Sequence, residues 1–203
     1  GIRCFNVESP TELDRLNDVA GRLGKRAPIA FRVNPDVDPK THPYISTGLK
    51  TAKFGVSFDQ AIELYQRAHS LPNIEIRGIA CHIGSQLLDP NPIAEAADRV
   101  LMLVDELAKI GIRLQHVDLG GGLGIRYRDE QPPKHGDYLY PLLAKFEGRS
   151  EMLCFEPGRS LVGNAGLLLT RIEFLKHGEA KNFCIVDAAM NDLARPALYD
   201  AYH

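Results

Sequence analysis

Apolar and polar positions along the chain follow two periods that succeed each other. Short apolar runs bounded by turn-forming residues predict five β-strands, at residues 4–7, 29–33, 79–83, 117–119 and 152–155. Apolar residues at helical spacing lie between several of these runs, over 10–23, 57–68 and 93–109. Strands that alternate with helices predict an α/β fold whose parallel sheet has helical crossovers.

Helix-start signals stand ahead of two of these helices. Ser9–Glu12 and Ser57–Gln60 both have the capping-box pattern, a serine followed three residues later by glutamate or glutamine. Pro10 occupies the first helical position of the earlier helix, and Gly24 follows its end. Both segments are therefore predicted to cap a helix.

Polar and glycine-rich residues come directly after the predicted strands. They are Asn34–Pro35, His82–Ser85, Gly120–Gly124 and Glu156–Arg159. Active sites of (β/α)8 barrels lie at the carboxyl ends of the strands, so this pattern predicts a partial TIM-type barrel with a site at that edge. Five strands are fewer than the eight of a whole barrel. We therefore expect this chain to be a fragment or a truncated form of a longer protein.

The alternation of strand and helix stops after Gly163. Two apolar segments, 167–174 and 183–187, follow each other without a helical pattern between them. We expect residues 1–163 to form the partial barrel and residues 164–203 to begin an all-β C-terminal domain.

Composition argues against several classes of protein. The 203 residues carry a formal net charge of -2, which gives no electrostatic signature for nucleic acid or for an anionic membrane. No apolar run is long enough to span a bilayer. Cys4, Cys81, Cys154 and Cys184 lie far apart, without metal-ligand spacing. We expect a cytoplasmic, enzyme-like domain with reduced cysteines, no metal, and no nucleic-acid or membrane partner.

The segment Val117–Gly124 contains three consecutive glycines and, after one leucine, a fourth. Glycines at a strand end indicate that something approaches the backbone closely. Bare N–H groups at a strand-to-helix turn suit a phosphate, although the spacing fits neither the Rossmann nor the P-loop pattern. Taken alone, the segment is compatible with a phosphate site or with a tight structural turn.

Four segments in this order resemble those of the diaminopimelate decarboxylases, which are fold-type III, pyridoxal-phosphate-dependent enzymes. They are Cys81–Gln86, Gly120–Gly124, Glu156–Arg159 and Arg195–Tyr199, and His42–Gly48 and Lys53–Gly55 extend the similarity. The resemblance implies an alanine-racemase-like barrel, pyridoxal 5′-phosphate as cofactor, and decarboxylation of meso-2,6-diaminopimelate to L-lysine and CO2. It also implies a small-molecule amino-acid substrate and a homodimer with active sites at the interface.

The resemblance assigns the catalytic roles to Glu156 and His82. Glu156 would keep the cofactor's ring nitrogen protonated, because a neighbouring carboxylate favours the charged form. His82 would lie flat against the cofactor ring. From the residues alone, Glu156 is also compatible with a solvated strand-end glutamate, and His82 with a core histidine. The implied cofactor contacts are His82, Ser85, Gly121, Gly122, Glu156, Pro157, Gly158 and Arg159.

Substrate contacts are expected from Arg159, Arg195 and Tyr199. The far end of diaminopimelate carries a carboxylate, which pairs bidentately with a guanidinium, whereas the distal amine of ornithine or lysine would call for acidic residues. Other readings stay open: Arg159 on the phosphate, Arg195 as a surface arginine, Tyr199 as a packed aromatic, and Ser85 as an ordinary turn residue.

The lysine that anchors the cofactor in this family is expected outside this chain. No lysine here has the family's Ala-x-Lys-Ala-Asn context, Lys50 and Lys53 are predicted loop residues, and the Cys-Glu-Ser motif is not found. We therefore expect these residues alone to be inactive. Two alternatives stay open. One is a decarboxylase of the same fold that acts on ornithine, arginine or carboxynorspermidine, and the other is a non-catalytic relative that binds a protein partner.

Overall fold

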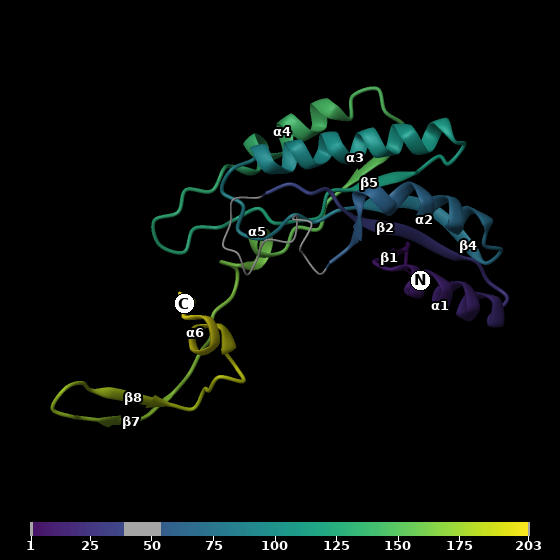
Figure 1. Ribbon diagram of the computed structural model, residues 1–203. Coiled ribbons are helices and arrows are strands. Elements are labelled where there is room, and N and C mark those ends of the chain that lie inside the picture. Colours follow the sequence, from purple (N-terminus) through teal and green to yellow (C-terminus); the bar gives the residue numbers. More distant parts are fainter. Residues whose placement is uncertain (1, 39–53, 203) are drawn as a thin grey trace.

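The computed structural model describes residues 2–38 and 54–202, in which a parallel sheet has helices packed along one face (Figure 1). Neighbouring strands are parallel and lie in the order β1 (Phe5–Val7), β2 (Ala27–Asn34), β4 (Ile74–Ala80), β5 (His116–Asp118) and β6 (Met152–Cys154). Strand β3 (Val56–Ser57) pairs with the end of β2. The segment His42–Gly48, Lys50 and Lys53 lie outside the described residues.

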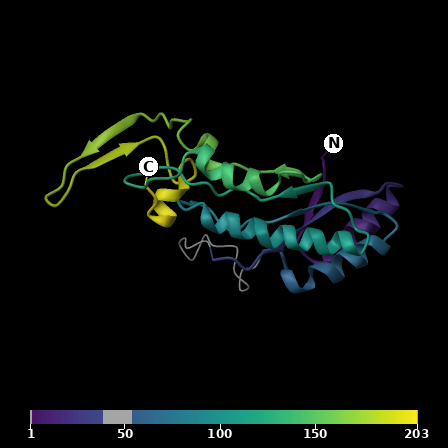
Figure 2. The same cartoon turned by 90° about the horizontal axis from the view of Figure 1, so that it is seen from above.

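Helices connect these strands and cover the sheet on one side (Figure 1, Figure 2). They are α1 (Pro10–Arg22), α2 (Phe58–Ser70), α3 (Asn91–Lys109) and α4 (His135–Lys145). The core lies between the two layers, where the rings of Phe31 on β2 and Tyr65 on α2 meet edge to face at 4.9 Å. Sequential strand–helix units in a parallel sheet confirm the predicted partial barrel. The described residues supply six strands, of which five follow one another across the sheet and the two-residue β3 pairs only with β2.

The two predicted capping boxes have different outcomes. The hydroxyl oxygen of Ser9 accepts a hydrogen bond from the Glu12 backbone N–H at 3.2 Å, as predicted. Ser57 precedes α2 but makes no capping bond, because its hydroxyl donates to Oε1 of Gln60 at 2.9 Å. The predicted helix start at Ser57 is therefore confirmed, but the predicted capping box is wrong, because the two side chains bond to each other instead of to the helix backbone.

Some element bounds also differ from the pattern. Strand β4 ends at Ala80 and not at residue 83, although the Cys81 N–H still donates to the Asp118 carbonyl at 2.8 Å. Helix α4 was not predicted, because Gly136 and Pro141 weaken its helical pattern. Among the described residues, no helix is both long enough and apolar enough to cross a membrane.

Residues beyond the sheet form an antiparallel hairpin that projects away from it (Figure 1, Figure 2). The hairpin consists of β7 (Ile172–Lys176) and β8 (Phe183–Val186) and agrees with the predicted loss of the helical pattern. The short helix α6 (Ala194–Tyr199), which the pattern did not indicate, follows it. The domain boundary at residue 163 stays a prediction.

Candidate active site

The sheet face opposite the helices carries the ionisable side chains of the candidate site. Strand register places Arg32, Ala80, Asp118 and Cys154 side by side on this face. Pairing continues past the strand ends, since the Leu119 N–H donates to the Cys154 carbonyl at 3.1 Å and the Glu156 N–H to the Gly120 carbonyl at 2.8 Å. Because side chains alternate along a strand, the next row on this face contains His82, Gly120 and Glu156.

His82 lies on the sheet face away from the helices, while Cys81 and Ile83 are buried on the other side. The Gly121 N–H donates to Nδ1 of His82 at 3.2 Å, so this nitrogen acts as an acceptor and the ring proton belongs on Nε2. Burial, with a smaller contribution from the charge of Arg32, lowers the pKa of His82. The imidazole is therefore held neutral at neutral pH.

The glycine segment fits closely against the two neighbouring loops. A Cβ on Gly121 would overlap the Glu156 carbonyl oxygen, and a Cβ on Gly122 would overlap the Gly84 carbonyl oxygen. Gly122 also has a φ of +109°, which favours glycine. No residue in the described ranges accepts a hydrogen bond from its N–H. The turn is thus tightly packed, and among the described residues it leaves the Gly122 N–H available to an external acceptor.

Ser85 lies two residues before Leu87, which pairs with the glycine segment through backbone hydrogen bonds. The Leu87 N–H donates to the Gly122 carbonyl at 2.8 Å, and the Gly124 N–H donates to the Leu87 carbonyl at 3.0 Å. Ser85 itself is half-buried. Serine and glycine, the two residues expected at a phosphate, therefore stand on adjacent, hydrogen-bonded segments.

Glu156 follows β6 at the same edge of the sheet. Glu156 is an exposed residue, but partial desolvation of its carboxyl group and the nearby negative charge of Asp118 raise its pKa, and the charge of Arg32 opposes this shift. Burial also raises the pKa of Asp118, whose carboxylate accepts a hydrogen bond from the Gly120 N–H at 2.8 Å. Two carboxyl groups therefore make this edge of the sheet a favourable place for a cationic ring nitrogen.

Arg32 is the positive charge that faces these groups. Its Nη1 forms an ion pair with the Glu8 carboxylate at 2.9 Å, and its guanidinium lies 5.0 Å from the centre of the Phe54 ring. Glu8 also accepts a hydrogen bond from the Gly55 N–H at 3.0 Å. The sequence prediction missed both Arg32 and Glu8, because a charged residue inside or next to a short apolar strand gives no motif.

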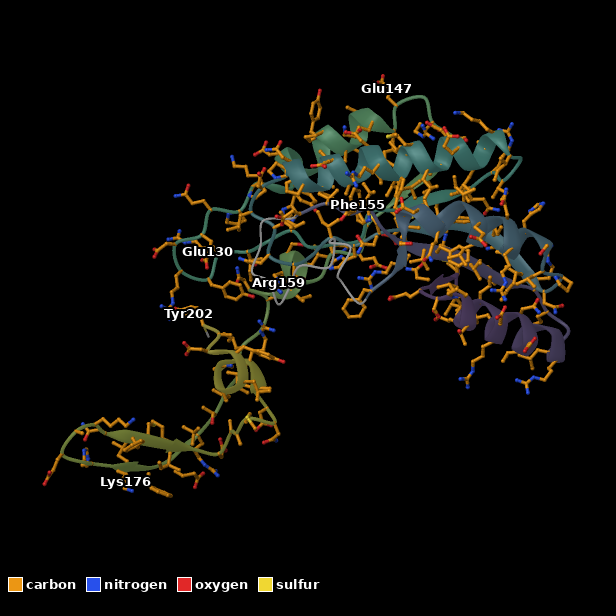
Figure 3. The ribbon with its side chains drawn as sticks, in the orientation of Figure 1. Glu130, Glu147, Phe155, Arg159, Lys176 and Tyr202 are labelled. Carbon is orange, nitrogen blue, oxygen red and sulfur yellow. The ribbon has the colours of Figure 1, made fainter. Side chains whose placement is uncertain are left out.

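Arg159 begins the short helix α5 (Arg159–Val162), between the sheet and the C-terminal helix in Figure 3. Its Nη1 donates to Oε1 of Gln86 at 3.3 Å and to the Tyr127 hydroxyl at 3.2 Å. The sequence prediction gave a role to Arg159 but to neither partner, although Gln86 ends the first motif and Tyr127 follows the glycine segment by three residues. Pro157 and Gly158, just before this helix, are exposed.

Arg195 and Tyr199 both lie on α6, where they are exposed and stack on each other. The Arg195 guanidinium lies 5.4 Å from the centre of the Tyr199 ring. Within the described ranges, no recorded interaction joins either residue to His82 or Glu156. The Tyr202 ring, however, lies 4.8 Å from the Arg128 guanidinium, which brings the segment after α6 against the loop that follows the glycine turn (Figure 3).

Residues 1–163 match the pyridoxal-dependent decarboxylases over their pyridoxal-binding domain. The chain belongs to this family. It is 61% identical over 203 residues to the diaminopimelate decarboxylase of Neisseria meningitidis serogroup B, and 60% identical over 202 residues to that of Pseudomonas aeruginosa. These matches cover 100% of the chain but 49% of each relative, so the chain spans about half the length of these curated relatives.

Solved structures of the family show the same fold. The diaminopimelate decarboxylase of Helicobacter pylori complexed with L-lysine superposes with a TM-score of 0.91 at 44% identity, over 100% of this chain and 51% of that one. The resemblance inferred from the four motifs and the partial-barrel architecture are thereby confirmed. The roles of the individual residues stay predictions.

Proposed function

We propose that this chain forms the cofactor-binding half of a decarboxylase that converts meso-2,6-diaminopimelate to L-lysine and CO2. The observation that carries the proposal is the arrangement at Gly121, whose N–H donates to His82 and whose Cα packs against the Glu156 carbonyl. The residues that would contact a pyridoxal ring thus meet at one turn. The names of the relatives support diaminopimelate as the substrate.

The donor set at this edge suits pyridoxal 5′-phosphate. The N–H of Gly122, which has no acceptor in the part of the chain that the structure describes, and the hydroxyl of Ser85 would hold the phosphate, with Gly121, Pro157 and Gly158 alongside. The neutral His82 ring would lie against the cofactor ring. When bound, the cofactor supplies an electron sink for the electron pair that remains when CO2 leaves.

Glu156 would accept a hydrogen bond from the cofactor's protonated ring nitrogen. The pKa of this carboxyl group is raised in the protein alone, so a positive ring nitrogen would bring it back toward its ordinary range. The two charges would stabilise each other, because a carboxylate next to a cation favours the ionised form of both. The electron sink depends on that proton staying on the ring nitrogen.

Arg159, Arg195 and Tyr199 are the proposed substrate contacts. The carboxylate that remains in L-lysine is the one that an arginine would bind, since a planar guanidinium can donate two parallel hydrogen bonds to it. The proposal also includes a C-terminal domain that begins at residue 164, a homodimer with its active sites at the interface, and a cytoplasmic location. The four unpaired cysteines support a reducing compartment.

A substrate panel tests the proposal. Protein expressed from its complete reading frame and supplied with pyridoxal phosphate is offered meso-diaminopimelate, ornithine, arginine and carboxynorspermidine, and CO2 release is measured. We expect release from diaminopimelate alone. Release from ornithine but not from diaminopimelate would contradict the proposed substrate, and no release from any of them, with cofactor bound, would favour a non-catalytic relative.

A further inference from the structure

Among the described residues, the guanidinium of Arg159 is held from one side only. Both recorded hydrogen bonds, to Gln86 and to Tyr127, leave from Nη1. In the part of the chain that the structure describes, nothing accepts a hydrogen bond from Nε or Nη2. The Nε–Nη2 edge is one of the edges through which arginine binds a carboxylate with two parallel hydrogen bonds.

The amide of Gln86 has only one orientation that satisfies its neighbours. Its Nε2 donates to the Ile125 carbonyl at 2.6 Å, and its Oε1 accepts from the Ile125 N–H at 3.2 Å. A flipped amide would set donor against donor and acceptor against acceptor. Oε1 therefore points where it also accepts from Arg159. Gln86 has a φ of +59°, a conformation that is costly for a residue other than glycine and that often marks functional sites.

Neither acceptor of Arg159 carries a negative charge. An amide oxygen and a hydroxyl orient the guanidinium without neutralising it, so its positive charge stays available for an anion. A carboxylate in the place of Gln86 would instead form an ion pair with Arg159 and compete with any bound anion.

We propose that Gln86 and Tyr127 are positioning residues that hold Arg159 with its Nε–Nη2 edge toward the carboxylate that L-lysine retains. This inference rests on the proposed function. The cofactor phosphate is the other anion that the same edge could bind, and the test separates the two.

The test compares two ligands that differ by that carboxylate. L-lysine and cadaverine share the same 1,5-diaminopentane skeleton, and only lysine carries a carboxylate on it. Calorimetric dissociation constants are measured on holoenzyme expressed from the complete reading frame. Gln86→Gly removes the side chain at a φ that glycine tolerates, and Tyr127→Phe removes only the hydroxyl. Gln66→Ala, at an exposed position of α2, is the matched control.

We expect each site variant to bind L-lysine about tenfold more weakly, the loss of one hydrogen bond to a charged group, while binding cadaverine within about twofold of wild type. The KM for diaminopimelate should rise in parallel, with a smaller change in kcat. Cofactor affinity and the control should match wild type.

Three results would overturn the inference. Equal weakening of lysine and cadaverine would mean that Gln86 and Tyr127 support the fold only. Weaker cofactor binding with unchanged lysine affinity would assign Arg159 to the phosphate. Unchanged lysine affinity and unchanged cofactor affinity in both variants would mean that Arg159 needs no positioning. A wild-type protein that releases no CO2 from diaminopimelate would overturn the proposed function itself, together with this inference.

Discussion

Gly121 is the residue on which the local geometry of the site depends most. Its N–H fixes the tautomer of His82, and the absence of a side chain lets the Glu156 carbonyl approach its Cα. The two residues proposed to contact the cofactor ring therefore depend on the same glycine. The charge of Arg32 also acts on both residues, because it lowers the pKa of His82 and opposes the rise in the pKa of Glu156.

Replacing Glu156 should separate activity from stability. The pKa of Glu156 is raised in the folded protein, so its ionised form lowers folding stability above the ordinary value of 4.5. We expect Glu156→Gln to reduce decarboxylation by roughly 10²-fold or more. At neutral pH the cofactor-free variant should melt at the same temperature as wild type or higher, and the difference should vanish at acidic pH. Calorimetry measures this, with Glu63→Gln on α2 as a control. A lower melting temperature at neutral pH would contradict the account.

His82 should titrate below the ordinary histidine value of 6.5, because burial disfavours its charged form. The unfolded chain then takes up the proton first, so the stability contributed by neutral His82 is present above pH 6.5 and is lost as pH falls through the folded pKa. Nitrogen-15 NMR of the imidazole, assigned with His82→Asn, should show the Nε2–H tautomer. A pKa above 6.5 or an Nδ1–H tautomer would rule out the acceptor role of Nδ1.

At the scale of single residues, motifs predicted more than periodicity did. The four motifs contained His82, Glu156 and Arg159, and the glycine segment indicated a close backbone approach. Arg32 and Tyr127 were missed because their contacts join segments that are far apart in the sequence. Gln86 ends the motif Cys81–Gln86, but its role depends on a left-handed backbone conformation that the sequence pattern does not show.

At the scale of elements, the site is made by three loops that follow β4, β5 and β6. Backbone hydrogen bonds link the first two loops through Leu87 and Gly122, and the last two through Gly120 and Glu156. The loops therefore form one hydrogen-bonded unit at the carboxyl ends of the strands. A substitution in the loop after β5, which contains the glycine segment, should therefore also disturb the loops after β4 and β6.

Gly121→Ala tests that coupling. The added Cβ would collide with the Glu156 carbonyl, so we expect a loss of about 1–3 kcal/mol in the free energy of unfolding and weaker cofactor binding. Gly136→Ala on α4 is the control, since nothing lies within 4 Å of its added Cβ. The control should be as stable as wild type or more stable by up to about 1 kcal/mol. Urea denaturation measures both variants, and equal stabilities would refute the close packing.

Element prediction succeeded where local chemistry acts alone. Ser9 caps α1 because its hydroxyl can reach the Glu12 N–H. Ser57 has the same pattern but bonds to the Gln60 side chain, a choice between two acceptable partners that the pattern cannot make. Helix α4 forms despite Pro141, because tertiary packing that buries Tyr138 and Leu142 outweighs the weak propensity.

At the scale of the whole molecule, the run of paired strands in the described sheet begins at β1 and ends at β6, so each of these strands has one unpaired edge. The segment beyond the sheet also exposes large apolar side chains. Leu167 and Leu169 are 102% and 96% exposed, and Phe174 is 61% exposed. Unpaired strand edges and apolar surface both favour association between chains.

We therefore expect the 203-residue polypeptide, expressed alone, to associate with itself. Light scattering coupled to size-exclusion chromatography should show oligomers or aggregates. The double substitution Leu167→Ser and Leu169→Ser should shift the distribution toward smaller species. A wild-type chain that elutes as a compact monomer and melts cooperatively would contradict this expectation.

The most direct test of the account is the stoichiometry of the proposed reaction. Holoenzyme from the complete reading frame is incubated with meso-diaminopimelate, and CO2 and L-lysine are quantified together, with Glu156→Gln in parallel. We expect equal amounts of the two products from wild type and strongly reduced amounts from the variant. A wild-type protein that binds pyridoxal phosphate but forms no lysine, or a variant as active as wild type, would contradict it.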